Sequence, residues 1–364
     1  MRDEGKAMSA SQAKPVVAIV GAGRVGRALG RRLHQRGWPI GAVVTRSLRT
    51  ARAAVRAIGA GNPSDRLDAS VLDADLILIA TPDVAIPSVA RQLAAFSGAP
   101  PFVSKGGGFD LSSRGKIVLH TRGALNRAVL RLNHRGTATK SNSDRAAVTR
   151  KDASLSKRGG FDLAQPWRGK IVLHTCGALD RAVLRPMERR GAATGALHPL
   201  QTFSGQHLPN LDGCACAIDG NPAAMACARR ICRELGCIPI RVPRNSRAAY
   251  HAAAVLAAGH VLAAVEAAAR ILMALGFSRR KAIKTLLPLT RQTLSNFERS
   301  GGPRSWTGPA SRGDLQTIRK HLSALRRFPR EYREAYAALT RLGVLLLARQ
   351  PRAARKRLQT ALRG

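Results

Sequence analysis

The sequence predicts an α/β domain with a largely parallel sheet, followed by an all-helical domain. The length of 364 residues is too great for a single small core. Within 15–243, short apolar runs alternate with amphipathic helical stretches, the pattern of a parallel sheet covered by helices. Within 244–347 the apolar spacing is helical only. We expect a disordered segment at 1–14 and a basic tail at 348–364.

The first predicted strand, turn and helix follow one another directly. Residues 15–20 form a continuous apolar run that predicts a buried parallel strand. An amphipathic helix is expected from Arg24 to Arg36, ended by Gly37, and residues 40–45 predict a second buried strand. This order of elements is typical of the first half of a nucleotide-binding α/β domain.

A G-x-G-x-x-G turn lies between that strand and helix, at Gly21, Gly23 and Gly26. The first glycine permits the tight turn, the second lets a pyrophosphate approach the backbone, and the third lets helix and strand pack closely. Arg24 and Val25 begin the helix, whose free N–H groups would bind the phosphates. In this strand–turn–helix context the motif predicts a Rossmann-like domain that binds a dinucleotide.

The residues after the second strand indicate which dinucleotide binds. An NAD site usually has Asp or Glu here to bind the ribose 2′-hydroxyl. This chain has Thr45, Arg46 and Ser47, with Arg49 and Arg52 just beyond. A guanidinium and a hydroxyl bind a 2′-phosphate that a carboxylate would repel. We therefore expect NADP, bound through Arg46 and Ser47, with NAD as the alternative.

One strand–helix segment occurs twice, as RGKIVLHTRGALNRAVLR at 114–131 and RGKIVLHTCGALDRAVLR at 168–185. Residues 105–158 read as a duplicated or inserted segment, in which 137–158 is polar and basic and predicts a disordered linker. Both copies contain the same predicted strand, so either could join the sheet. Short connections are the rule, and only the second copy leads directly to the motifs downstream.

Two turns follow predicted strands at the carboxyl edge of the sheet, where open α/β sheets bind their ligands. They contain Thr81-Pro82-Asp83 and Cys176-Gly177. We expect Thr81, Pro82 and Gly177 to line the nicotinamide side of the cofactor. As an alternative, Pro82 and Asp83 are simply turn-forming residues.

The longest apolar run is 252–276, and it contains His260, Glu266 and Arg270. Charged groups are costly inside a bilayer, so we interpret the run as a buried, alanine-rich helix. The N-terminal residues are polar and lack the apolar run of a signal peptide. The sequence therefore predicts a cytoplasmic protein without a membrane span.

The formal charge is +40, with 61 lysine and arginine residues. These residues are scattered, and aromatic residues make up only 4% of the chain, so the sequence does not predict specific nucleic-acid binding. The six cysteines lack C-x-x-C spacing and no histidine cluster accompanies them. Reduced thiols are expected, and no metal site.

Three motifs in the second half resemble a known family. They are GALHPLQTF at 195–203, YHAAAVLAAGHVLA at 250–263 and TGPASRGD at 307–314. Behind a G-x-G-x-x-G domain, this combination resembles the Rossmann-like proteins with domain of unknown function 2520. That family lies within the 6-phosphogluconate dehydrogenase-like group. The resemblance covers about 15 to 345, interrupted at 105–158.

The resemblance implies an NADP-linked oxidoreductase whose helical domain is of the 6-phosphogluconate dehydrogenase C-terminal type. Some members resemble an alternative ketopantoate reductase, which suggests a small 2-keto acid as substrate. We also expect a homodimer formed through the helical domain. The chain departs from the family pattern at Cys176, where serine is usual, and at Gly259, where asparagine is frequent. Ser305-Trp306 replaces the usual Ala-Leu.

Reduction of a carbonyl needs a proton donor for the developing charge on oxygen. The first long helix has no lysine but begins with Tyr250-His251. His251 is the first candidate donor, because imidazole titrates near neutrality, and His198 is the second. His174, inside a strand, is the third and could equally be a core residue.

Cys176 is included among the catalytic candidates, and Tyr250 among the groups that face the substrate. Arg312 could hold a substrate carboxylate, with Asp314 beside it. As an alternative, Asp314 caps a helix and Arg312 is solvated. An active cleft between the two domains is expected. The function predicted is NADP-dependent reduction of a small 2-keto acid; the alternative is a non-catalytic nucleotide-binding or regulatory protein.

Overall fold

In the computed structural model, the described residues are 14–96, 166–205, 207–243 and 245–362, together with four short strands between 111 and 139. They form two compact units, Met1–Ala252 and Ala253–Gly364. The division falls inside the first long helix, nine residues after the boundary expected from the sequence. The expected disordered segments at 1–14 and 137–158 lie outside the described residues, except for Lys14 and the strand Ala138–Thr139.

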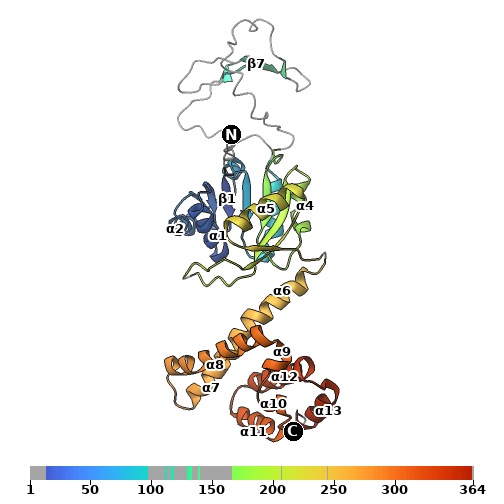
Figure 1. Cartoon of the computed structure of the whole chain (residues 1–364). Helices are drawn as coiled ribbons and strands as arrows, with labels where there is room; N and C mark the ends of the chain where they lie inside the picture. The colour runs from blue at the N-terminus through green and yellow to red at the C-terminus, as the bar shows by residue number, and fades with distance from the viewer. Residues whose placement is uncertain are drawn as a thin grey trace, which may run out of the picture. The chain divides into compact units, whose positions relative to one another are not determined.

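The first unit is built on a sheet covered by helices (Figure 1). The strand order of this sheet is β12-β11-β10-β9-β4-β1-β2-β3. Along the stretch β10-β9-β4-β1-β2-β3 of this sheet, each strand is parallel to the next. Strand β11 is antiparallel to β10 and parallel to β12. The bounds are β1 Val17–Val20, β2 Ile40–Val44, β3 Asn62–Ser64, β4 Leu76–Ile79, β9 Ile171–His174, β10 Ala193–Pro199, β11 Ala215–Gly220 and β12 Ile238–Ile240.

Helices cover both faces of this sheet. Alternate residues of a strand point to opposite faces, and here both sets are apolar, so both faces need cover. Val17 and Ile19 of β1 belong to one core cluster and Ala18 and Val20 to the other. The first cluster includes residues of α1, α2 and α5, and the second includes residues of α3 and α4. The bounds of these helices are α1 Arg24–Gln35, α2 Leu48–Ile58, α3 Ile86–Ala94, α4 Arg185–Glu188 and α5 Pro222–Glu234. The predicted doubly covered α/β domain is confirmed.

The second copy of the repeated segment provides the central strand β9, between β4 and β10. This agrees with the expectation from short connections. Trp167, just before this strand, is fully buried in the core, and the first copy has no tryptophan at the matching place. Strands β5 (Leu111–Ser112), β6 (Lys116–Val118), β7 (Val129–Leu132) and β8 (Ala138–Thr139) form a separate antiparallel group.

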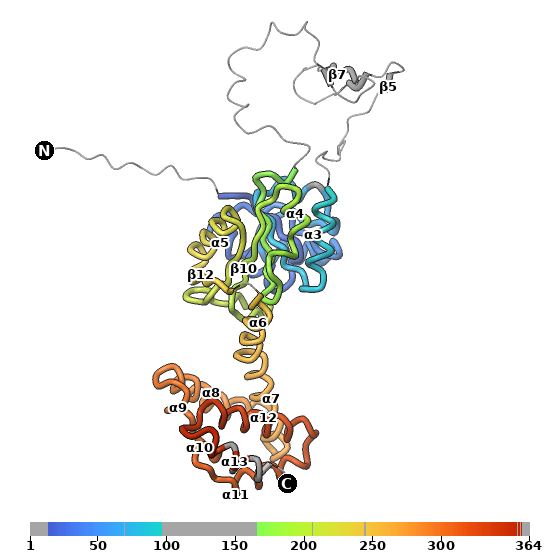
Figure 2. The backbone as a smooth tube through the Cα atoms, turned by 90° about the vertical axis from the view of Figure 1, so that its right-hand side faces the viewer, coloured from blue at the N-terminus to red at the C-terminus, as the bar shows by residue number. Residues whose placement is uncertain are grey.

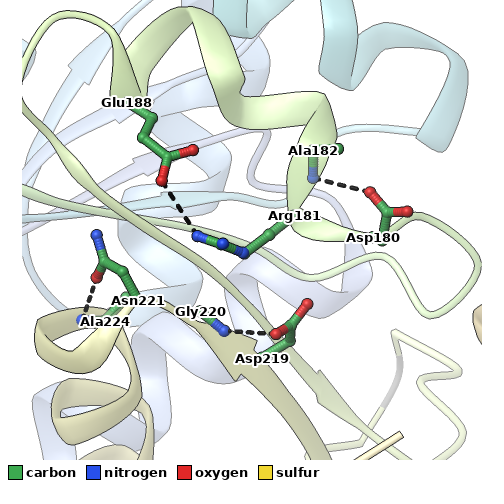
Figure 3. Close-up of polar contacts among 8 residues, drawn as sticks. All are labelled: Asp180, Arg181, Ala182, Glu188, Asp219, Gly220, Asn221 and Ala224. Atoms are coloured by element: carbon green, nitrogen blue, oxygen red, sulfur yellow. Dashed lines mark hydrogen bonds and ion pairs between the residues drawn. The ribbon is translucent and has the colours of Figure 1, made fainter. Parts of the chain in front are cut away.

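Local polar contacts fix the chain before β10 and after β11 (Figure 3). Asp180 Oδ1 accepts from Ala182 N at 2.8 Å and caps the short 3-10 helix Arg181–Leu184. Arg181 then pairs with Glu188 of α4 at 3.1 Å. Asn221 caps α5 by accepting from Ala224 N at 3.1 Å. Such caps satisfy N–H groups that lack partners inside a helix.

The second unit is helical, as predicted. Helix α6 begins in the first unit, and a π-helical segment, Leu256–His260, joins it to α7, so that one helical run spans Arg247–Ala274 (Figure 2). The bounds are α6 Arg247–Val255, α7 Val261–Ala274, α8 Arg279–Ser300, α9 Gly302–Ser305, α10 Pro309–Arg312, α11 Leu315–Ala324, α12 Arg330–Leu347 and α13 Pro351–Leu362.

The expectation that the apolar helix is buried is wrong. Its most apolar window has a mean hydropathy of 1.7, yet only 6% of that window is buried. The reason is that α7 packs on α8 and leaves its other face uncovered. Among the described helices, this run is the one long and apolar enough to cross a membrane by length and composition. Glu266 on it pairs with Arg270 and Arg279, so it carries charge at mid-length.

The basic segment at 348–364 also differs from the expected tail. Most of it is the helix α13, and Leu358 is only 2% exposed. This side chain packs in a small core with Ile318 of α11 and Val344 of α12. Burial of this one leucine anchors a helix that also carries four basic residues.

Candidate functional site

The glycine-rich turn has the geometry that a dinucleotide requires. Gly21 has φ +89°, and a Cβ there would lie 2.6 Å from Thr81 Cγ2. A Cβ on Gly26 would lie 2.5 Å from the carbonyl oxygen of Gly21. At Gly23, by contrast, no described atom lies within 4 Å of the Cβ position, so the space beside α1 is open. The first turn of α1, which starts at Arg24-Val25, has no acidic residue to repel an anion.

Arg46 follows β2 and is exposed, and none of the described residues forms an ion pair or hydrogen bond with its side chain. Ser47 caps α2 by accepting from Thr50 N at 3.3 Å. The hydroxyls of Thr45 and Thr50 lie 2.6 Å apart and complete this local network. The guanidinium is therefore free for a phosphate, while the Ser47 hydroxyl already has a structural role.

A cluster of aromatic polar side chains lies at the carboxyl edge of the sheet. The His198 side chain comes from β10, and its Nδ1 lies 3.1 Å from the Tyr250 hydroxyl of α6. The His198 and His251 rings are 6.1 Å apart between centroids, in edge-to-face orientation. A Cβ on Gly177 would lie 2.7 Å from His198 Nε2 and 2.8 Å from His251 Cδ2, so only glycine permits both rings to approach.

Two histidines of this region are held neutral. Burial, and then the nearby charges of His251 and Arg247, lower the pKa of His198 to about 4. Burial and the charge of Arg247 likewise lower the pKa of His174 to about 4. His174 is fully buried, and neither ring nitrogen has a hydrogen-bond partner in the described part of the chain. Its location in β9 fits a core residue rather than a proton donor.

Cys176 lies in the turn after β9 and is 5% exposed. Its Sγ accepts hydrogen bonds from Ala178 N and Leu179 N, both at 3.3 Å. Burial and the neighbouring Asp83 raise the pKa of the thiol to about 11, so it is not a thiolate at neutral pH. This geometry favours a structural role in the turn over the chemical one predicted. Across the edge, the buried Thr81 Oγ1 has no partner among the described residues, so it is available to a ligand.

Arg312 and Asp314 belong to the second unit. Asp314 accepts from Thr317 N at 3.0 Å and from the Thr317 hydroxyl at 2.7 Å, and so caps α11. This is the alternative role considered for it. Arg312 is exposed and lines a cavity of about 670 Å³ together with Arg304, Trp306 and Arg349.

Arg247 was not singled out from the sequence. It is the first residue of α6, and it is 4% exposed. The signal that could have found it is its spacing, three and four residues before Tyr250 and His251, which places all three on one helical face. In a chain with so many arginines this spacing does not stand out. The six cysteines are free thiols, and no group of three or more metal ligands occurs among the described residues.

Comparisons with protein families match two parts of the chain. Residues 214–342 match the family profile of domain of unknown function 2520. Residues 16–103 match the profile of the coenzyme F420-dependent NADP oxidoreductases. No curated protein matches the chain closely enough to be counted as a relative.

Solved structures resemble the chain over most of its length. A Bacteroides fragilis protein assigned to the NADP oxidoreductases is 18% identical, with a TM-score of 0.59, covering 94% of this chain and 98% of its own. An imine reductase from Myxococcus stipitatus in complex with NADP⁺ is 17% identical, with a TM-score of 0.54 and coverages of 91% and 94%. A reductive aminase from Aspergillus terreus in complex with NADPH is 13% identical, with a TM-score of 0.55 and the same coverages. At these identities the likeness establishes the fold.

Proposed function

Because the chain is a Rossmann-like protein that carries domain of unknown function 2520, we propose that it is an NADP-dependent reductase of small 2-keto acids. The observation that carries the proposal is the cluster of His198, Tyr250 and His251 at the same sheet edge as the glycine-rich turn. Ketopantoate is the first substrate to try. Cytoplasmic localisation goes with this proposal.

The residues present fit a dinucleotide. The open space at Gly23 and the helix N-terminus beside it would receive the pyrophosphate, and the free Thr81 hydroxyl would face the cofactor. When bound, the nicotinamide supplies the hydride. Pro82 and Gly177 would lie along its edge, because both follow strands at the carboxyl side of the sheet.

Arg46 would select NADPH over NADH through charge-assisted hydrogen bonds to the 2′-phosphate. Such bonds contribute about 1.5–3 kcal/mol, which corresponds to a preference of roughly ten-fold or more. Titration of both cofactors against the wild-type protein and Arg46→Asp checks this, with Arg91→Asp, at an exposed arginine of α3, as control. Equal affinities of the wild-type protein for NADPH and NADH would contradict the assignment.

His251 is the proposed proton donor to the carbonyl oxygen. His198 has a pKa of about 4, so it is neutral at physiological pH and does not serve as an imidazolium acid. If the Tyr250 hydroxyl donates to His198 Nδ1, the proton of that ring stands on Nε2, beside Gly177. His198 would then orient Tyr250 and offer a neutral hydrogen bond to the substrate.

We propose that a second copy of the chain packs on the exposed leucines of the helical unit, forming a homodimer. Leu262 of α7 is 70% exposed, Leu289 of α8 is 66% exposed and Leu346 of α12 is 63% exposed. Large apolar side chains that are this exposed on three helices of one unit are candidates for an interface. Glu266, paired with two arginines and with its pKa lowered to about 2 by them, keeps its charge and disfavours a bilayer as the partner.

A further inference from the structure

Arg247 is a buried cation without a counter-ion in the structure. The residue is 4% exposed, and both Nη1 and Nη2 lack a hydrogen-bond partner among the described residues. No ion pair within the described ranges joins it to a carboxylate. The guanidinium has five N–H donors in a fixed fork, and that fork matches a carboxylate.

Burying such a group unpaired lowers stability, because the charge is removed from water without compensation. The many exposed arginines of the chain already supply its surface charge, so solubility does not explain why this one is buried. An anion from outside the protein would complete the missing contacts. Unpaired buried polar groups of this kind are typical of functional sites.

The position of Arg247 selects the anion. It shares a helical face with Tyr250 and His251, the residues proposed to act on the carbonyl. Its charge acts on His198 and His174, the histidines of β10 and β9. The guanidinium therefore belongs to the histidine cluster and not to the phosphate-binding turn. The Asp83 charge acts on the same two histidines and the Asp180 charge acts on His174, but neither carboxylate forms an ion pair with Arg247 within the described ranges.

We propose that Arg247 binds the carboxylate of the substrate, in place of Arg312, and so makes the site specific for anionic carbonyl compounds. The inference rests on the proposed function for the identity of the substrate class. Arg247 would hold the carboxylate end, while Tyr250 and His251, one turn further along the same face, would meet the adjoining carbonyl. A 2-keto acid has its two groups on neighbouring carbons and would fit this spacing.

The test measures binding of oxamate, a carboxylate mimic of 2-keto acids, and of oxamide, its uncharged counterpart, to the NADP⁺-loaded protein by calorimetry. The variants are Arg247→Met, Arg247→Lys, Arg312→Met and Arg241→Met, the last being an exposed arginine of the same unit. Arg247→Met should weaken oxamate binding about ten- to hundred-fold and leave oxamide and NADPH binding unchanged. Arg247→Lys should retain part of the affinity, and the other two variants should bind like wild type.

Thermal unfolding distinguishes a binding role from a structural one. Arg247→Met should unfold at the same temperature as wild type or higher, because an unpaired buried charge is replaced by an apolar side chain. The inference is overturned if Arg247→Met unfolds at a lower temperature than wild type or loses NADPH binding. It is also overturned if wild type does not bind oxamate, or binds it no more tightly than Arg247→Met does. If oxamate binding depends on Arg247 but no 2-keto acid supports NADPH oxidation, the proposed function is refuted and the inference is not. Oxamate binding that depends on Arg312 instead would leave the function standing and refute the inference.

Discussion

Cys176 and Asp180 are the two positions at which the second copy of the repeat differs from the first, and both have structural roles. The Cys176 thiol is buried in the turn after β9, and the Asp180 carboxylate caps the following 3-10 helix (Figure 3). The first copy has Arg122 and Asn126 in their places. Asparagine is also a good helix cap. An arginine at the buried position, however, would introduce an unpaired charge into the core.

Cys176→Arg should therefore destabilise the protein strongly, by roughly 3 kcal/mol or more, because a buried charge would lack a partner. Cys176→Ser preserves a small hydrogen-bond acceptor and should change the free energy of unfolding by about 1 kcal/mol or less. Urea-induced unfolding of the three proteins measures the difference. Equal stability of the arginine variant and wild type would show that the turn can accommodate the residue of the first copy.

His174 should make the folded state sensitive to acid. Its pKa in the folded protein is about 4, below the ordinary value near 6.5. The unfolded chain therefore binds more protons between these values, and stability is complete above about pH 6.5 and declines as the pH falls through 4. The loss amounts to roughly 3 kcal/mol at most for this buried ring.

His174→Asn removes this titration. Between pH 7 and pH 4, the free energy of unfolding of the variant should fall less than that of wild type. The difference should become measurable about one to two pH units below neutrality. Parallel pH profiles for the two proteins would contradict the lowered pKa. His198 contributes in the same direction, so the variant should retain part of the acid sensitivity.

At the level of elements, the inserted segment should be dispensable. The eight-stranded sheet takes its central strand from the second copy, and the buried Trp167 occurs only there. Deletion of 107–158 removes one repeat unit and rejoins Gly106 to the GGFDL sequence at 159–163. We expect unchanged cofactor affinity and a thermal midpoint close to that of wild type. A deletion variant that fails to fold would show that the first copy contributes to the core.

The matched control deletes the corresponding second unit, 159–210, which removes β9 and β10 together. That variant should not fold, because its sheet would lack two central strands. Circular dichroism and NADPH titration compare the two deletions. If both behave alike, the assignment of β9 to the second copy is wrong.

The elements of the first unit could be predicted because local signals agree with the fold. Continuous apolar runs gave β1 and β4, and the three glycines located the turn and the start of α1. The burial of the long helix was not predictable, because an alanine-rich apolar sequence has the same pattern whether its own chain or another molecule covers it. Arg247 was missed for a related reason: the sequence shows the spacing of its helical face but not which surface that face meets.

At the scale of the whole molecule, the exposed leucines predict self-association. Replacing Leu262 and Leu289 by arginine should abolish a dimer, since each change places a charge in an apolar interface. Val84→Arg is the control, because Val84 is 91% exposed and lies in the other unit. Sedimentation at several protein concentrations gives the answer. A wild-type protein that remains monomeric at all of them would exclude the proposed dimer.

The proposed reaction is reduction of a carbonyl by NADPH at the histidine cluster of the first unit. It is tested most directly by NADPH oxidation with ketopantoate and other 2-keto acids, catalysed by wild type, His251→Ala and His260→Ala. His260 is an exposed histidine nine residues along the same helical run, so it controls for loss of an imidazole as such. We expect substrate-dependent oxidation of NADPH by wild type and by His260→Ala. Turnover by His251→Ala should be lower by about two to four orders of magnitude, with NADPH affinity unchanged. Absence of oxidation by wild type, or equal turnover by wild type and His251→Ala, would contradict the proposed reaction.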